Sequence, residues 1–96
     1  MTHRFLSPAL RELTKAAEYY EAEQRGLGAD FLREVETAIA RILRNPEAWM
    51  RLSPNTCRCR THRFPFGIIY QIRGDMILVV SVMDLRRHPD SWRGNL

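Results

Sequence analysis

The sequence lacks the features that mark a membrane protein, a secreted protein or a nucleotide-dependent enzyme. No apolar run reaches the roughly 18 residues needed to span a bilayer, and the N-terminal MTHRFLSPAL contains no apolar signal-peptide core. There is no GxGxxG motif, no P-loop and no GxSxG motif. We therefore expect a cytoplasmic protein that contacts no membrane, uses no cofactor and is not a serine hydrolase.

Cysteine is scarce, and so are acidic residues in the second half of the chain. The two cysteines, Cys57 and Cys59, are separated by one residue, a spacing that disfavours a disulfide within one strand. Together with His62 they lack the second ligand pair of a closed zinc site. Residues 49–96 contain only three acidic side chains, which argues against chemistry based on paired carboxylates. We expect two reduced, half-buried thiols and no metal.

Arginine is abundant instead. Fourteen of the 15 basic residues are arginine, with Lys15 as the exception. Residues 1–48 carry seven basic and eight acidic side chains, a net charge of −1, whereas residues 49–96 carry eight and three, a net charge of +5. The forked guanidinium favours planar contacts to phosphate or carboxylate groups. The charge distribution predicts an anionic partner for the second half.

The first half predicts a short strand and two helices. Residues 3–7 form the strand, and Ser7 followed by Pro8 starts a helix over about residues 8–24. Apolar residues three or four positions apart give this helix one buried face, formed by Leu10, Leu13, Ala17 and Tyr20. A second helix, which begins near Leu27 and ends at Asn45-Pro46, has a similar face, formed by Phe31, Val35, Ala38, Ile39 and Ile42. The short Gly-rich turn between the helices predicts an antiparallel hairpin.

The second half predicts antiparallel strands. Alternating apolar residues over 64–72, a two-residue turn at Gly74-Asp75 and an apolar return over 77–82 predict a β-hairpin. The return is apolar on both faces, so we expect it centrally, with helices on one face and a partner protein as one candidate cover for the other. The expected fold is a single α+β domain over residues 1–96. It comprises an N-terminal strand and a two-helix antiparallel hairpin packed on a three-stranded antiparallel β-sheet.

The first of two basic clusters is RCRTHR at residues 58–63. In an extended segment Arg58 and Arg60 share one face, where a row of guanidinium groups can follow a phosphate backbone. Arg63, beside His62, extends the cluster. The alternative is an edge strand that its charges keep soluble. The residues alone leave both interpretations open.

The second basic cluster, in MDLRRHPDSW, follows the apolar return. Arg86 and Arg87 stand where the strand ends, and His88 has an ordinary pKa near neutrality. Trp92 offers a face on which a base could stack. If the sheet joins both clusters, they form one positive surface. The alternative is that Trp92 packs back on the core while a nearby aspartate neutralises an arginine.

Five segments together resemble the RelE/ParE toxin superfamily of bacterial type II toxin–antitoxin and plasmid-stabilisation modules. In order, between about Pro8 and Arg93, they are AAEYYE, GLGADFLREVETAIARI, NPEAW, RFPFGIIYQI and ILVVSVMDLRRHPDSW. The resemblance implies the same α+β fold and a cognate antitoxin, encoded beside the toxin, whose C-terminal segment wraps the toxin. It therefore also implies a toxin–antitoxin hetero-oligomer. Such a segment folds on binding and covers apolar and basic surface together.

The resemblance implies one of two targets. RelE-like members cut messenger RNA in the ribosomal A site with basic side chains and a C-terminal Tyr or His, whereas ParE-like members inhibit DNA gyrase by binding. Here Trp92 follows Arg86 where RelE-like enzymes have the tyrosine, and an indole N–H only donates. A nuclease would therefore rely on His88, with His62 as an assistant, and its catalytic candidates are Arg60, Arg63, Arg86 and His88.

We expect a ParE-like inhibitor of DNA gyrase. The alternatives are a ribosome-dependent messenger RNA endoribonuclease and a non-toxic basic binding module. On this expectation the target is bound by the basic residues of both clusters and by the tryptophan, namely Arg58, Arg60, Arg63, Arg86, Arg87 and Trp92.

Overall fold

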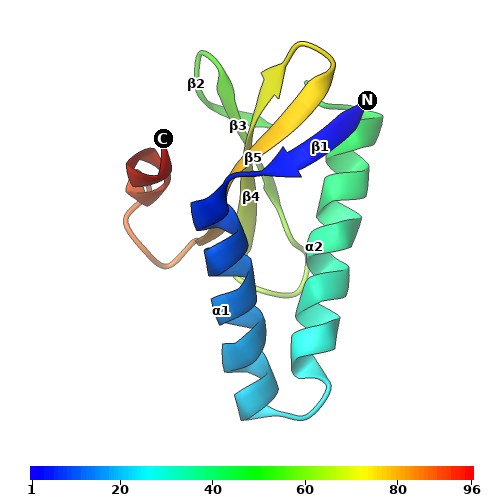
Figure 1. Cartoon of the computed structure of the whole chain (residues 1–96), viewed down its shortest axis with the longest axis vertical. Helices are drawn as coiled ribbons and strands as arrows, with labels where there is room; N and C mark the ends of the chain where they lie inside the picture. Colours follow the sequence, from blue (N-terminus) through cyan, green and yellow to red (C-terminus); the bar gives the residue numbers. More distant parts are fainter.

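The fold is a helical hairpin packed against one face of a five-stranded sheet (Figure 1). The computed structural model describes all residues, 1–96. In chain order the elements are β1 Thr2–Phe5, α1 Ser7–Glu23, α2 Leu27–Arg44, β2 Met50–Ser53, β3 Thr56–Arg60, β4 Phe66–Arg73, β5 Met76–Asp84 and the 3₁₀ helix η1 Ser91–Asn95. The expected α+β class with its N-terminal strand and helical hairpin is confirmed. Neither α-helix combines the length and apolar character that crossing a bilayer requires.

The sheet is mixed, with the strand order β1-β5-β4-β3-β2. β2, β3, β4 and β5 are joined by antiparallel pairings, whereas β1 lies parallel to β5, with Phe5 opposite Val79. The expected three-stranded, purely antiparallel sheet is therefore incomplete. β1 adds a parallel pairing because both helices and the strands β2, β3 and β4 lie between it and β5 in the chain, and together they return the chain to the end of the sheet where β1 begins. β2 escaped sequence reasoning because it is only four residues long, too short for its alternation of apolar and polar residues to indicate a strand.

The inner face of α1 includes most, but not all, of the apolar residues expected there, and several of its residues are alanines. Ala9 is fully buried, and Leu13, Ala16, Ala17 and Tyr20 pack against the main core. The assignment of Leu10 to this face is wrong, because its side chain is 47% exposed. The helix starts one residue earlier than expected, at Ser7, and no side chain caps it. The alanines let α1 approach its neighbours closely, and this sets which face turns inward.

The main core lies between the helices and the sheet. All five apolar residues expected on the inner face of α2 are buried there, as predicted. Tyr20, Phe31, Phe64 and Phe66 form an aromatic cluster in which Tyr20 lies 4.7 Å from Phe64 and 5.3 Å from Phe31, between ring centroids. Burial raises the pKa of the Tyr20 hydroxyl. α2 begins very close to α1. A Cβ atom added at Gly28 would lie only 2.7 Å from the Ala17 carbonyl oxygen.

A second, smaller core lies on the opposite face of the sheet. It consists of Ile69, Val80, Met83 and Trp92, with Leu6, Leu52 and Leu85 partly buried around it. β5 is an interior strand between β1 and β4, in agreement with the prediction from its two apolar faces. On this face the chain's own C-terminal segment supplies cover, where the sequence suggested a partner protein. Figure 1 shows η1 on the side of the molecule away from α2.

Glu12 joins α1, β5 and the C-terminal segment. Its Oε1 accepts hydrogen bonds from Ser81 Oγ at 2.8 Å, from the Val82 backbone N–H at 3.1 Å and from Asn95 Nδ2 at 3.2 Å. Asn95 also donates to the Val80 carbonyl oxygen at 3.0 Å. The pairing of β4 and β5 is irregular beside Val80, between Ser81 and Val79. The carboxylate of Glu12 therefore accepts hydrogen bonds from groups of strand β5 next to the position where its pairing with β4 is irregular.

We expect Glu12→Ala to lower the free energy of unfolding by about 2 to 4 kcal/mol, because it removes the acceptor of several partly buried donors. Urea unfolding followed by circular dichroism measures the change. Glu18→Ala, an exposed position on the same helix, is the matched control and should change stability little. Equal losses in the two variants would show that the Glu12 hydrogen bonds do not stabilise the fold.

Candidate functional site

The strand β3 separates its cysteines from its arginines. Cys57 and Cys59 face the main core, whereas Arg58 and Arg60 alternate with them and so share the other face, as the sequence predicted. Both thiols are free and buried, so the expectation of half-buried thiols is wrong. The cause is the cover from α2, where Cys59 Sγ lies 3.9 Å from the Ala38 carbonyl oxygen. Burial raises the pKa of the Cys59 thiol, which favours its neutral form.

Arg63 is held against α2 rather than beside Arg58. Its backbone N–H and that of His62 donate to Oε1 of Glu34, at 2.8 and 2.9 Å. Its guanidinium pairs with Asp30 at 3.3 Å and lies 5.3 Å from the Phe64 ring centroid. The positive charge of Arg63 is thus partly neutralised by a carboxylate of α2.

A groove runs along the open edge of β3, beyond the point where β2 stops pairing with it. The last pair of that ladder is Met50 with Arg58. The groove has a volume of about 620 Å³, and the residues that line it are Arg41, Trp49, Met50, Arg58, Arg60, Thr61 and His62. We call it the β3-edge groove. It gathers two arginines and the histidine of the first basic cluster with residues from α2 and from the segment before β2.

Arg41 organises one wall of the β3-edge groove. It donates to the Arg60 carbonyl oxygen at 3.1 Å and contacts Nε2 of His62 at 3.0 Å. Because a guanidinium only donates, this ring nitrogen of His62 is the acceptor. The Arg41 guanidinium also lies 5.6 Å from the Trp49 ring centroid. Sequence reasoning missed Arg41 and Trp49, since no local spacing connects an arginine on α2 with a strand that begins 15 residues later.

In the second basic cluster, Arg86 forms a fork with Asp84. Its Nε and terminal nitrogen donate to the two carboxylate oxygens at 3.0 and 2.9 Å, and its backbone N–H donates to Oδ1 at 3.0 Å. These hydrogen bonds lower the pKa of Asp84. Arg87 is exposed and has no carboxylate partner. Of the adjacent arginines, only Arg87 therefore presents an uncompensated charge.

His88 and Trp92 occupy different environments beyond the strand. His88 is exposed, and its Nδ1 accepts the Asp90 backbone N–H at 3.1 Å. Trp92 is only 2% exposed and lies in the second core, with the Arg93 guanidinium 4.5 Å from its ring centroid. The ring therefore has no free face on which a target base could stack in this structure. Its position corresponds to the alternative in which it packs back on the core.

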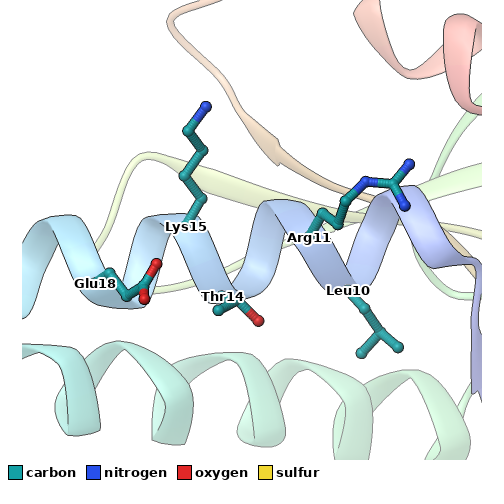
Figure 2. Close-up of a pocket in the computed structure, with 5 residues that line it drawn as sticks. All are labelled: Leu10, Arg11, Thr14, Lys15 and Glu18. Atoms are coloured by element: carbon teal, nitrogen blue, oxygen red, sulfur yellow. The ribbon is translucent and has the colours of Figure 1, made fainter.

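The helix α1 carries a second hollow, at a place where the sequence predicted no site. Five residues of α1 line it, with a volume of about 280 Å³: Leu10, Arg11, Thr14, Lys15 and Glu18. Figure 2 shows the Leu10 and Thr14 side chains on the side of α1 that faces α2, and Lys15 on the opposite side. The exposed Leu10 is the one apolar residue among the five that line this hollow.

Comparisons with known proteins identify the family. No curated protein matches the sequence. Among solved structures, a chain of the "Chromosomal ParDE TA system from P. aeruginosa" matches with a TM-score of 0.66 and 15% identity, over 88% of this chain and 96% of that one. At this identity the likeness concerns the fold. The family model described as "ParE toxin of type II toxin-antitoxin system, parDE" matches residues 4–89, from β1 to just beyond β5. The chain therefore belongs to the ParE toxin family of type II toxin–antitoxin systems.

Proposed function

We propose that the protein is a toxin that a cognate antitoxin neutralises, and that it acts by binding DNA gyrase without catalysing a reaction. Membership of the ParE family supports this proposal. The observation that carries it is that carboxylates of the chain itself hold two of the catalytic candidates. Arg63 pairs with Asp30 on α2, and Arg86, just after β5, pairs with Asp84. A ribonuclease would need these groups and a proton carrier to converge on one phosphate.

The arginine side chains suit binding better than acid–base catalysis. With a pKa above about 12, an arginine stays protonated, so it can hold an anion but is a poor proton carrier. His62 is engaged with Arg41, which leaves His88 as the remaining candidate for proton transfer. The messenger RNA endoribonuclease remains the second candidate function, because Nε2 of the exposed His88 makes no hydrogen bond to another residue.

The antitoxin needs surface on this protein, and exposed apolar residues on the helices support a place for it. Leu10 in the hollow of α1 and Leu32 on α2 are large apolar side chains left exposed on the helical hairpin. An amphipathic segment that passes around α1 could bury them and place acidic side chains against Arg11 and Lys15 on the other side of the helix. We propose that the antitoxin covers part of this surface in a toxin–antitoxin hetero-oligomer.

Two assays on the same purified toxin test the proposed target. We expect inhibition of DNA supercoiling by gyrase, and intact messenger RNA in a reconstituted translation reaction. Addition of the antitoxin should restore supercoiling. New messenger ends at codons in the ribosomal A site, with gyrase unaffected, would instead establish the endoribonuclease. Normal growth of cells that express the toxin alone would leave only the non-toxic binding module.

A further inference from the structure

The β3-edge groove concentrates hydrogen-bond donors that have no partner. Across the chain, three buried side-chain nitrogen or oxygen atoms lack a hydrogen bond: Arg41 Nε, Trp49 Nε1 and Arg58 Nε. All three belong to residues that line this groove. Buried polar groups are nearly always paired, and an unpaired one is unfavourable. Three unpaired donors and no unpaired acceptor in one place indicate a site for an anionic acceptor.

The charges of the groove agree with its donors. Three of its seven lining residues are arginines, and none is acidic. Arg58 and Arg60 form no ion pair, whereas Arg33, Arg63, Arg86 and Arg93 each pair with an aspartate. The groove therefore holds guanidinium groups whose charge the chain itself does not neutralise. An incoming anion would meet a positive field with no competing carboxylate among the lining residues.

The groove is also held in place before any ligand arrives. Arg41 is fixed by the Arg60 carbonyl oxygen, by His62 and by the Trp49 ring. On the other wall the stem of Arg58 packs over Gly67, where an ideal Cβ would lie 3.0 Å from Arg58 Cγ. Any larger residue at position 67 would push the Arg58 stem away. Donors that are already oriented lose little conformational freedom on binding, which favours affinity.

We propose that the β3-edge groove binds the phosphate group of a nucleotide unit. A tetrahedral phosphate has more acceptor oxygens than a carboxylate and can accept hydrogen bonds from donors on both walls together. The volume of about 620 Å³ exceeds one phosphate and lies within the usual range for small-ligand sites. Trp49 and Met50 supply apolar surface for the attached nucleoside. The proposal does not depend on which target the toxin inhibits.

The indole N–H signals report directly on ligand binding in the groove, because the chain has two tryptophans and only Trp49 lines the groove. In nuclear magnetic resonance spectra of the ¹⁵N-labelled full chain, inorganic phosphate at constant ionic strength should shift the Trp49 indole signal in a saturable way. Trp92 packs in the second core and does not line the groove, so its signal should stay unchanged. Acetate should bind at least about tenfold more weakly. No saturable shift with phosphate, or an equal response to acetate, would overturn the proposal.

Variants locate the site. Arg58→Gln should weaken phosphate binding at least about tenfold. Arg73→Gln is the matched control, because Arg73 lies on the neighbouring strand β4, outside the groove, and donates to Gln71. Trp49→Phe, which keeps an aromatic side chain but removes the indole N–H, should also weaken binding, measured by backbone shifts. Equal weakening by Arg58→Gln and Arg73→Gln would show diffuse attraction and overturn the site, and this comparison is independent of any gyrase assay.

Two further ligands distinguish a phosphate of a free nucleotide from a phosphate of a nucleic-acid backbone. Adenosine monophosphate and a short single-stranded RNA are titrated against the same signals. Tighter binding of the mononucleotide assigns the site to a terminal phosphate of a free nucleotide. Tighter binding of the strand, with an affinity that falls steeply with salt, assigns it to a backbone phosphate. Failure of both to compete with inorganic phosphate would overturn the nucleotide assignment.

Discussion

Replacing Arg86 and Arg87 together with alanine is expected to abolish growth arrest when the toxin is expressed without its antitoxin. The two arginines follow closely after the end of strand β5, near the end of the basic half of the chain. With Asp84 beside them, the local charge is +1, and in the double variant it becomes −1. An anionic target surface that the wild-type protein attracts would therefore be repelled.

The double variant should stay folded. Arg86 and Arg87 are both exposed, and ion pairs at exposed positions add little to stability. Circular dichroism and retained binding of the antitoxin check the fold. A matched pair of exposed arginines, Arg25 in the turn between the helices and Arg44 at the end of α2, serves as the control for lost charge. Retained growth arrest in a soluble Arg86→Ala, Arg87→Ala protein would contradict the prediction, and loss of arrest in both pairs would point to net charge alone.

His88→Ala separates the two targets that the family resemblance leaves open. The side chain is exposed and its only hydrogen bond is to a backbone N–H in the turn that follows. For a gyrase inhibitor that acts by binding, we expect growth arrest close to that of the wild type. A large loss confined to messenger RNA cleavage would assign His88 to proton transfer instead.

The sequence predicts best those elements whose signal is local and repeated. The inner face of α2 carries five apolar residues at helical spacing, and all are buried. The β4–β5 hairpin carries both strand alternation and Gly74, whose φ of 58° suits the first central position of its tight turn. Leu10 was misplaced because α1 has more apolar positions than its contact face can bury, and small alanines decide the rotation of the helix.

Non-local features of the site could not be read from spacing. The pairing of Arg86 with Asp84 has a local signal, two residues apart, and the sequence suggested that an aspartate could neutralise an arginine. The partners of Arg63 lie 33 and 29 residues away on α2. Arg41 and Trp49 come to the β3 edge only because α2 packs on this side of the sheet. The composition indicated an arginine-rich surface, but only the fold decides which arginines keep an uncompensated charge.

Trp92→Ala is expected to lower the free energy of unfolding by about 3 to 5 kcal/mol, the range for removing a fully buried large aromatic side chain. The ring is 2% exposed and packs with Ile69, Val80 and Met83. Its loss would leave a cavity on the face of the sheet that the C-terminal segment covers. Urea unfolding measures the change, with Tyr19→Ala as the control, because that aromatic side chain is 56% exposed.

Trp92→Phe distinguishes a core residue from one that binds the target. Phenylalanine fills much of the same space, so stability should recover to within about 1 to 2 kcal/mol of the wild type. If the ring acts only through the fold, growth arrest should recover together with stability. A Phe variant that is stable but no longer toxic would place Trp92 in the target interface, which would require η1 to leave the sheet on binding.

Equal stability of Trp92→Ala and Tyr19→Ala would show that the C-terminal segment does not stabilise the second core. That result would leave Leu52, Ile69 and Val80 as an apolar surface open to a partner.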